Sequence, residues 1–375
     1  MFLIVSHARF ELDGTPTHGT GSELTTFFQR KKKPYIFIWH SLFHGFSTQV
    51  ETYQRGSLKR KFIGFNNIPF LIRIFQEQLI NFFYIFYYGS QIKVFIGIDP
   101  LNALSGIIAK RLGIVKRAIF YTADYAVKRF DSYILNKIYH AIDAYAAKNS
   151  DEVWNVSSRI TELRVKQGVP KDKNFFIPNT PEFSKVPRLS KDKINKHDLV
   201  IVSNITKAIN YPRIIKATKN LSKKFPDIRL LIIGTGDYQK DLEKFVKRLN
   251  LTKRVVFLGR RKHDEVLKIL SSCGVGIAIY TREYPWTEFG DSMKVREYLA
   301  CGLPVIISDV VSTSDDIKNY NAGFVLEKDA GNFEEVVDKI FSEKKLYESL
   351  RKNAISLARK YDFTLLMEKR LGRFI

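Results

Sequence analysis

The segment LIIGTGDYQKDLEKF (residues 231–245) predicts a buried strand, a glycine turn and an amphipathic helix, in that order. Gly234 and Gly236 allow the chain to turn tightly and allow a ligand to approach the backbone. The pattern is only G-x-G, so it does not meet the dinucleotide-binding fingerprint. A strand–helix turn that needs glycine for its own geometry explains it equally well.

The same strand–helix alternation runs through most of the chain. In the first half, strands are expected at 2–5, 35–39, 93–98, 117–122, 152–156 and 174–178, and helices include 101–112 and 132–148. In the second half, strands are expected at 199–203, 228–234, 254–259, 274–280, 304–308 and 323–326. Helices between them are expected at 211–224, 237–249, 263–272, 292–301 and 331–342. Such alternation predicts an α/β fold with parallel sheets covered on both faces.

A stretch rich in Pro, Ser, Lys and Asp divides the two halves and predicts a connection. We expect a Rossmann-like N-terminal domain over 1–180, a linker over 181–198 and a second Rossmann-like domain over 199–355. The remaining residues, 356–375, are expected to form a C-terminal helix. Two doubly wound domains in tandem place a cleft between the carboxyl ends of two sheets, where such sheets bind ligands.

The composition of the chain indicates a globular protein that interacts with anions. Its 375 residues suit two domains, and its formal net charge is +23. Basic clusters occur at 29–33 and 53–61, which suggests nucleic acid, acidic lipid or phosphorylated substrates, or else a solvated basic surface. Nucleic-acid binding would depend on charge alone, because no zinc-finger, RNA-binding or basic-zipper pattern occurs, and we expect no such partner.

No run of 18 uncharged apolar residues predicts a transmembrane helix. Residues 68–98 come nearest, but charged side chains interrupt them. A core-facing helix followed by a strand is the favoured interpretation, and a helix lying on a membrane surface is the alternative. Cys273 and Cys301 lie in apolar contexts without metal-type spacing, so we expect buried thiols in a reducing compartment.

Polar loops after the expected strands are candidate binding segments in the first half. Residues 13–28 are polar, contain glycine and precede a helix whose free amides could hold a phosphate, with Ser22 as a candidate cap. His18 is a candidate ligand contact, although a solvent-facing loop histidine is as good an interpretation. Asp124 directly follows the expected strand 117–122, and a helix-capping role is its alternative.

The segment TEFGDSMKVREYLACG (287–302) is the strongest candidate in the second half. A helix starting near Ser292 places Lys294 in its first turn, where the helix dipole disfavours a cation unless an anion binds there. Glu297 lies three residues later on the same face and could accept hydrogen bonds from a ribose diol. The alternative is an exposed surface pair of Lys294 and Glu297.

These motifs resemble the signature of GT-B glycosyltransferases, most closely the retaining family 4 enzymes (glycosyl transferases group 1). The resemblance rests on IIGTGDYQKDLEKFVKRLNLTKRVVFLGRRKHDEVLKIL (232–270) followed by EYLACGLPVIISD (297–309). It is strong over 199–345, weaker over 93–180 and faint before that. It implies two Rossmann-like domains facing across a cleft, with the C-terminal helix crossing back to the N-terminal, acceptor-side domain.

The resemblance also implies roles for particular residues. Glu297 would hold the donor ribose, and Lys294 would contact the diphosphate, as in the branch whose motif reads P-x-K-x-x-E-Y. HGTG would form the phosphate loop of the N-terminal domain. The expected donor-binding residues are Gly19, Thr20, Gly21, Lys207, Gly234, Gly236, Arg261, Gly290, Ser292, Lys294 and Glu297. His18 is expected on the acceptor side, and Asp124 and Asp291 are the catalytic candidates.

The sequence departs from the family pattern at two places. The family has two glutamates with seven residues between them, but Phe289 occupies the first position. We therefore expect Asp291 to contact the donor sugar instead, and the backbone around Gly290 and Ser292 is the alternative. The family also has an Arg and a Lys after the first strand of the second domain, where this chain has Asn204 and Ile209. Asn cannot replace the bidentate grip of Arg on phosphate, so Lys207 or Arg282 would have to compensate together with Lys294.

The expected function is transfer of a sugar, with retention, from a nucleotide diphosphate donor to a glycan or lipid-linked acceptor in surface polysaccharide or glycolipid synthesis. No metal or other cofactor is expected. We expect a cytoplasmic protein, peripheral at the inner face of a membrane with anionic lipid. The main alternative is a catalytically inactive GT-B scaffold or binding subunit; a sugar-nucleotide epimerase is disfavoured because its histidine and carboxylate spacing is missing.

Overall fold

The computed structural model describes the chain except for residues 12, 18, 43–45, 284–286 and 327–330. Contacts between Cα atoms divide it into two compact units. The N-terminal unit comprises Met1–Pro178 together with Thr364–Ile375, and the C-terminal unit comprises Asn179–Phe363. Each unit is a sheet covered by helices, as the sequence predicted.

The N-terminal unit contains an eight-stranded sheet in the order β4-β3-β2-β1-β5-β6-β7-β8. The strands are β1 (Phe2–Ala8), β2 (Tyr35–Ser41), β3 (Thr48–Gln54), β4 (Ser57–Ile63), β5 (Val94–Ile98), β6 (Arg117–Thr122), β7 (Glu152–Asn155) and β8 (Asn174–Phe176). All neighbouring pairs are parallel except β2–β3 and β3–β4. The six predicted strands are therefore all present, with bounds that differ from the expected ones by at most three residues.

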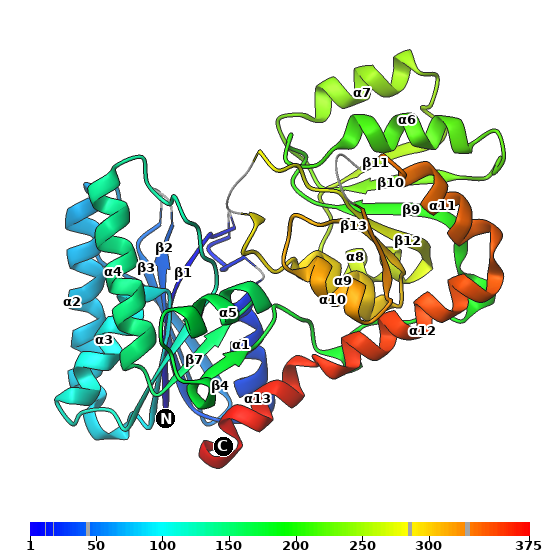
Figure 1. Cartoon of the computed structure of the whole chain (residues 1–375). Helices are drawn as coiled ribbons and strands as arrows, with labels where there is room; N and C mark the ends of the chain where they lie inside the picture. The colour runs from blue at the N-terminus through cyan, green and yellow to red at the C-terminus, as the bar shows by residue number, and fades with distance from the viewer. Residues whose placement is uncertain (12, 18, 43–45, 284–286, 327–330) are drawn as a thin grey trace. The chain divides into compact units, whose positions relative to one another are not determined.

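Helices cover both faces of this sheet (Figure 1). They are α1 (Thr20–Arg30), α2 (Phe70–Tyr88), α3 (Pro100–Arg111), α4 (Tyr133–Asn149), α5 (Ser158–Lys166) and α13 (Phe363–Leu371). The helices α2, α3 and α4 lie side by side on one face. On the other face α13 packs beside α1, where Arg30 donates to the Thr364 hydroxyl and Lys31 pairs with Glu368. A C-terminal helix thus belongs to the N-terminal unit, as the fold class predicted, but it starts at Phe363. Residues 356–362, which we expected in the same helix, belong to the C-terminal unit.

The hairpin formed by β3 and β4 was missed because its sequence was interpreted only as a basic cluster. Arg55 and Gly56 form its turn with φ of 49° and 81°, which is the conformation of a tight I′-type hairpin. The usual Asn-Gly signal is replaced by Arg-Gly, so the turn was not recognised. As the edge strand, β4 exposes Lys59 and Lys61, and charges at an edge oppose unwanted strand pairing.

The C-terminal unit contains a six-stranded parallel sheet in the order β11-β10-β9-β12-β13-β14. The strands are β9 (Asn195–Val202), β10 (Arg229–Ile233), β11 (Val255–Gly259), β12 (Cys273–Ala278), β13 (Val305–Ser308) and β14 (Gly323–Leu326). The helices are α6 (Tyr211–Leu221), α7 (Gln239–Arg248), α8 (His263–Ser272), α9 (Met293–Cys301), α10 (Thr313–Asn319), α11 (Phe333–Ser342) and α12 (Lys344–Lys360). This strand order is that of a doubly wound Rossmann sheet.

Residues 181–198 differ from the linker that we expected, because they pack on the C-terminal unit. Val186 is buried in a core cluster of that unit, and the Arg188 guanidinium donates to the carbonyl of Ala300 at 3.1 Å. The Phe183 amide donates to Asp362 at 2.7 Å. A few apolar and capping contacts therefore attach a segment whose composition is that of a linker.

Candidate functional site

The strand order of the C-terminal unit locates its candidate ligand site. The chain passes from β9 toward β10 and β11 on one side, and β12, β13 and β14 follow on the other. The connections after β9 and β12 therefore diverge, which opens a crevice at the carboxyl ends of these two strands. The loops after β9 and β12 and the start of α9 lie at this edge.

The start of α9 is fixed to the sheet but is not capped by a side chain. Ser292, at the N-cap position, shares a hydrogen bond of 2.9 Å with the Tyr280 hydroxyl and makes no capping bond to α9. The Tyr298 hydroxyl accepts from the Val202 amide at 2.7 Å, which ties α9 to the last residue of β9. Gly276 makes room for this contact, because a Cβ there would lie 2.4 Å from the Tyr298 ring.

Lys294 is exposed in the first turn of α9, as the sequence predicted. The amides of a helix start carry partial positive charge, so a lysine at this position is unfavourable by itself. An anion held between the amides and the ammonium would reverse that effect. The start of α9 at the switch point thus carries positive charge that a bound anion would offset.

Glu297 is buried and faces a partner that the sequence analysis did not identify. Its Oε1 lies 2.8 Å from Nε2 of His263, the first residue of α8. The carboxylate keeps further acceptor capacity beside this bond, because it has about four lone-pair sites. In the sequence, the signal for this partner was the position of His263 shortly after the expected strand 254–259.

Asp291 is placed differently from the donor-contacting position that we expected. Its carboxylate is buried and accepts from Arg296 at 2.7 Å, from the Thr313 hydroxyl at 2.9 Å and from the Asn179 amide at 2.8 Å. Arg296 also pairs with Asp316 at 2.6 Å. Burial disfavours the charged form of Arg296, but the two carboxylates outweigh it and raise its pKa. Asp291 therefore acts as an internal ion-pair partner that orients α9.

The neighbouring donor candidates have internal roles as well. Ser292 uses its hydroxyl on Tyr280 and its amide on the Thr313 hydroxyl at 3.0 Å. The Gly290 amide closes a turn on the Thr287 carbonyl at 3.1 Å. These internal hydrogen bonds fix the conformation of the loop before α9 and explain why its sequence is polar.

Gly234 and Gly236 are required by the protein's own backbone. A Cβ at Gly234 would lie 1.9 Å from the Ser203 carbonyl oxygen, and Gly234 has a φ of 134°. A Cβ at Gly236 would lie 2.3 Å from the Ile205 carbonyl oxygen. Both glycines therefore let the loops after β9 and β10 pack together, which is the structural alternative raised from the sequence.

Several cations lie on loops at the carboxyl edge of this sheet. Lys207 is exposed after β9, where its ammonium lies 5.9 Å from the centre of the Tyr238 ring. Arg261 is exposed after β11. Arg282 follows β12 and pairs with Asp309 at 2.5 Å. Asn204 is exposed, whereas Ile209 is buried in the core and therefore cannot face a ligand.

In the N-terminal unit, the loop before α1 agrees only in part with the phosphate-binding helix start that we expected. Gly19 precedes α1 with no atom within 4 Å of its would-be Cβ, and Thr20 is the first residue of the helix. Gly21 is buried, and a Cβ there would lie 2.4 Å from the Trp39 ring, so packing requires this glycine. Ser22 accepts from the Gly19 amide at 2.7 Å. The candidate residue His18 lies outside the described residues.

Asp124 follows β6 at the carboxyl edge of the N-terminal sheet, as predicted. Its side chain is exposed and pairs with Arg129 at 2.9 Å. The pKa of Arg129 is raised, because the neighbouring Asp124 charge outweighs the effect of burial. Asp124 is thus accessible at this edge.

The switch point of the N-terminal sheet lies between β1 and β5, and it contains a polar cluster that the sequence analysis missed. His7, near the end of β1, lies between two carboxylates: Nδ1 is 2.7 Å from Asp99 and Nε2 is 3.0 Å from Glu77. Asp99 directly follows β5 and has a φ of 96°, a strained value for a residue other than glycine. In the sequence, the signal for Asp99 was its position directly after the expected strand 93–98 and before Pro100.

The two histidines of this region have opposite protonation. Burial lowers the pKa of His7, but Asp99 and Glu77 outweigh this effect and raise it to about 10. Burial lowers the pKa of His40 to about 4. His40 Nε2 lies 3.0 Å from the side-chain Oδ1 of Asn81, and the side-chain Nδ2 of Asn81 donates to Oδ1 of Asn102 at 3.1 Å. The switch point thus holds an imidazolium between carboxylates beside a neutral, hydrogen-bonded imidazole.

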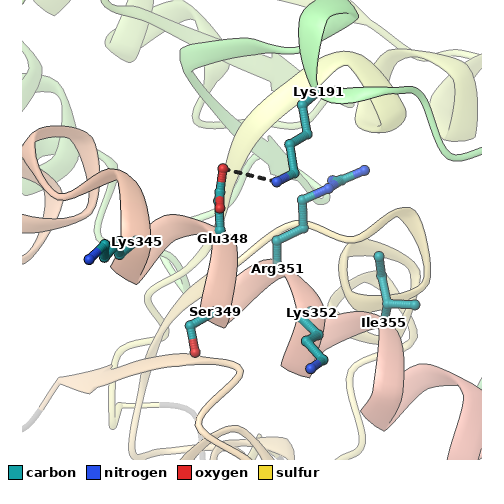
Figure 2. A pocket seen from close by; sticks show the side chains of 7 residues that line it. All are labelled: Lys191, Lys345, Glu348, Ser349, Arg351, Lys352 and Ile355. Carbon is teal, nitrogen blue, oxygen red and sulfur yellow. Dashed lines mark ion pairs between the residues drawn. The ribbon is translucent and has the colours of Figure 1, made fainter.

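A shallow hollow of about 550 Å³ lies elsewhere in the C-terminal unit, lined by Lys191, Lys345, Glu348, Ser349, Arg351, Lys352 and Ile355 (Figure 2). Lys191 pairs with Glu348 at 2.9 Å. Arg351 donates to the carbonyls of Gly302 at 2.9 Å and Leu189 at 3.0 Å. This hollow therefore adjoins the C-terminal end of α9, the opposite end from Ser292. No cluster of metal-binding side chains occurs among the described residues.

Comparison with known proteins supports the fold described above. The family model described as Glycosyl transferases group 1 matches residues 185–357. An uncharacterized glycosyltransferase of Methanocaldococcus jannaschii is 28% identical over 148 residues, which are 37% of this chain and 34% of that protein. The Escherichia coli UDP-Gal:alpha-D-GlcNAc-diphosphoundecaprenol alpha-1,3-galactosyltransferase is 24% identical over 260 residues, 65% of each chain. The chain thus spans between about a third and two thirds of the length of these curated relatives.

Among solved structures, Anabaena Alr3699/HepE in complex with UDP is similar over 100% of this chain and 98% of that chain, with a TM-score of 0.72 and 14% identity. This similarity and the two doubly wound units define a GT-B fold. Residues 185–357 are thus similar to the group 1 glycosyl transferases.

Proposed function

We propose that the protein transfers a sugar from a nucleotide diphosphate donor, with retention of configuration, to a glycan or lipid-linked acceptor at a membrane surface. The family match covers the unit that contains α9. One relative is named for a diphosphoundecaprenol acceptor and a UDP-Gal donor, and one structural neighbour was solved with UDP. These findings support a nucleotide sugar as donor and a lipid-linked acceptor as the first class to test.

The observation on which the proposal rests is the uncapped start of α9 with exposed Lys294. In the proposed reaction the acceptor hydroxyl oxygen bonds to the anomeric carbon while the bond from that carbon to the diphosphate oxygen breaks. The hydroxyl proton passes to the departing diphosphate. Positive charge aimed at the leaving group stabilises the transition state more than the ground state. We assign this role to Lys294 and the first amides of α9, with Lys207 and Arg261 assisting.

Glu297 is proposed to accept hydrogen bonds from the donor ribose while His263 holds the carboxylate in place. Gly19 and Thr20 are proposed to contact the donor from the N-terminal unit, and Asp124 is the catalytic candidate on that unit. Asp291, Ser292, Gly290 and the packed glycines are proposed to shape the site without touching the donor.

A matched pair of lysine variants tests this assignment. Lys294 and Lys345 are both exposed, and each is the second residue of its helix, α9 and α12. Lys294→Ala should lower turnover of the preferred nucleotide sugar by about 10²-fold, because it removes a charge-assisted contact to the leaving diphosphate. Lys345→Ala should leave turnover unchanged. Equal turnover of both variants and the wild type would contradict the assignment.

The donor is identified by thermal shift across UDP, GDP, ADP and CMP sugars, since a ligand at a hundred times its Kd stabilises a fold by about 2.7 kcal/mol. Retention is tested by NMR of the new glycosidic bond. Binding of a nucleotide sugar with no transfer to any lipid-linked or glycan acceptor would instead indicate an inactive GT-B binding subunit.

A further inference from the structure

The helix α2 has its polar and apolar residues on the opposite sides from those of an ordinary surface helix. Its buried side includes Glu77 and Asn81, which contact His7 and His40. Its solvent side exposes eight large apolar side chains: Phe70, Leu71, Ile72, Phe75, Leu79, Phe83, Phe86 and Tyr87. Phe75, Leu79 and Phe83 are spaced four residues apart, so they form one stripe along the helix. Phe75 is 65% exposed and Phe83 is 60% exposed.

The apolar surface continues beyond α2 on the same unit. Phe65, just before the helix, is 77% exposed. The helix α4 lies on the same face of the sheet (Figure 1). It exposes Tyr133, Ile134 and Ile138. Exposed apolar surface of this extent marks an interaction site in a soluble fold.

The charged residues around the stripe indicate which kind of partner it would contact. Residues 56–98 contain five lysines and arginines but a single acidic residue, Glu77, which is buried. Lys59 and Lys61 are exposed on the edge strand β4, and the Lys61 ammonium lies 5.6 Å from the centre of the Tyr84 ring of α2. The stripe on α2 has aromatic side chains, flanking cations and no exposed carboxylate, so it is complementary to an anionic lipid surface. Just before α4, the exposed Asp131 lies 3.4 Å from the Lys128 ammonium, which offsets its charge.

The helix α2 has 19 residues and includes the charged residues Arg73 and Glu77. Within the described part of the chain, no helix reaches the combination of length and hydropathy that crossing a bilayer requires. A helix that is apolar on one side and engages buried polar partners on the other meets a bilayer from the interfacial plane.

We infer that the outer face of α2, together with Phe65 and the start of α4, is a docking surface for an anionic lipid bilayer. Both helices begin at the carboxyl edge of the sheet, because α4 follows β6 and α2 ends just before β5. The docked bilayer would therefore lie next to the His7–Asp99 switch point. This part of the inference rests on the proposed function, since it brings a lipid-linked acceptor from the bilayer to that edge.

Vesicle sedimentation with the full chain tests the inference. The wild type should bind vesicles of equal parts phosphatidylcholine and phosphatidylglycerol, and bind less to phosphatidylcholine alone or at high salt. The double variant Phe75→Ser/Phe83→Ser should bind at least about tenfold more weakly, because two aromatic side chains no longer enter the interface. Both positions point to solvent, so far-UV circular dichroism and thermal unfolding should match the wild type.

Leu365→Ser is the control, because Leu365 is an exposed leucine on α13, which packs beside α1 on the other face of the sheet. It should bind vesicles as the wild type does. Wild-type vesicle binding by the double variant would overturn the inference. A lipid-free dimer in sedimentation velocity that the double variant dissociates would also overturn it, because the stripe would then be a self-association surface. Nucleotide-sugar stabilisation of the double variant should be unchanged, which separates this test from that of the donor site.

Discussion

Replacement of Asp291 by alanine distinguishes an internal ion-pair role from a donor contact. The carboxylate has no exposed surface and accepts from Arg296, Thr313 and the Asn179 amide. Loss of one partner of a buried charged pair costs about 3–5 kcal/mol. Arg296 keeps Asp316 at 2.6 Å, so we expect the lower end of that range, about 3 kcal/mol. In a unit of this size each kcal/mol lowers Tm by about 2–4 °C, so the expected decrease is about 6–12 °C.

Two further variants give an order of effects. Arg296→Met should destabilise the unit more than Asp291→Ala, because it leaves two buried carboxylates, Asp291 and Asp316, without their shared cation. Thr313→Val removes one neutral hydroxyl and should cost about 1 kcal/mol.

The assay is differential scanning calorimetry of the full chain with and without UDP. Preserved Tm in Asp291→Ala combined with lost sugar transfer would refute the reasoning, because Asp291 would then act on the substrate. Equal Tm decreases for Arg296→Met and Thr313→Val would also contradict the charge argument.

Three other results are expected. Gly234→Ala should destabilise the C-terminal unit by more than about 2 kcal/mol in chemical denaturation, because its Cβ would lie 1.9 Å from a backbone oxygen. Gly331→Ala is the control, because no atom lies within 4 Å of the Cβ that it would add, and its stability should be within about 0.5 kcal/mol of the wild type. The pKa of His7 is about 10 in the fold and 6.5 in the unfolded chain, so its contribution to stability is present below pH 6.5 and is lost between pH 6.5 and 10. The free energy of unfolding should fall over this window by at most about 1.4 kcal/mol per pH unit. Denaturation at a series of pH values should show this slope, and His7→Gln should abolish it. His40 has the opposite sign: its lowered pKa makes stability fall as the pH decreases from 6.5 to about 4, and His40→Gln should remove that acid-side loss.

The strand–helix alternation was predictable because each buried strand of a parallel sheet is a short apolar run. The edge hairpin was not, because β4 is exposed and its sequence, SLKRKFI, contains three consecutive cations. A strand that buries neither face leaves no hydrophobic period in the sequence.

The candidate site was predictable only where a residue conflicts with its local surroundings. Lys294 was recognisable because a cation opposes the dipole at a helix start. The role of Asp291 was not, since its partners Thr313 and Asn179 are distant in sequence and only tertiary packing brings them together. His7, Glu77 and Asp99 are likewise separated by up to 92 residues, so no local pattern links them.

The return of α13 to the N-terminal unit has a consequence for biosynthesis. Met367 and Leu371 are fully buried, and the Arg370 guanidinium lies 3.9 Å from the centre of the Phe175 ring. On the ribosome, residues 1–178 emerge long before residues 364–375, so the surface that receives α13 stays uncovered while the whole C-terminal unit is translated. The first unit to emerge is therefore the last to be completed, and nascent chains would need protection at that surface in the interval.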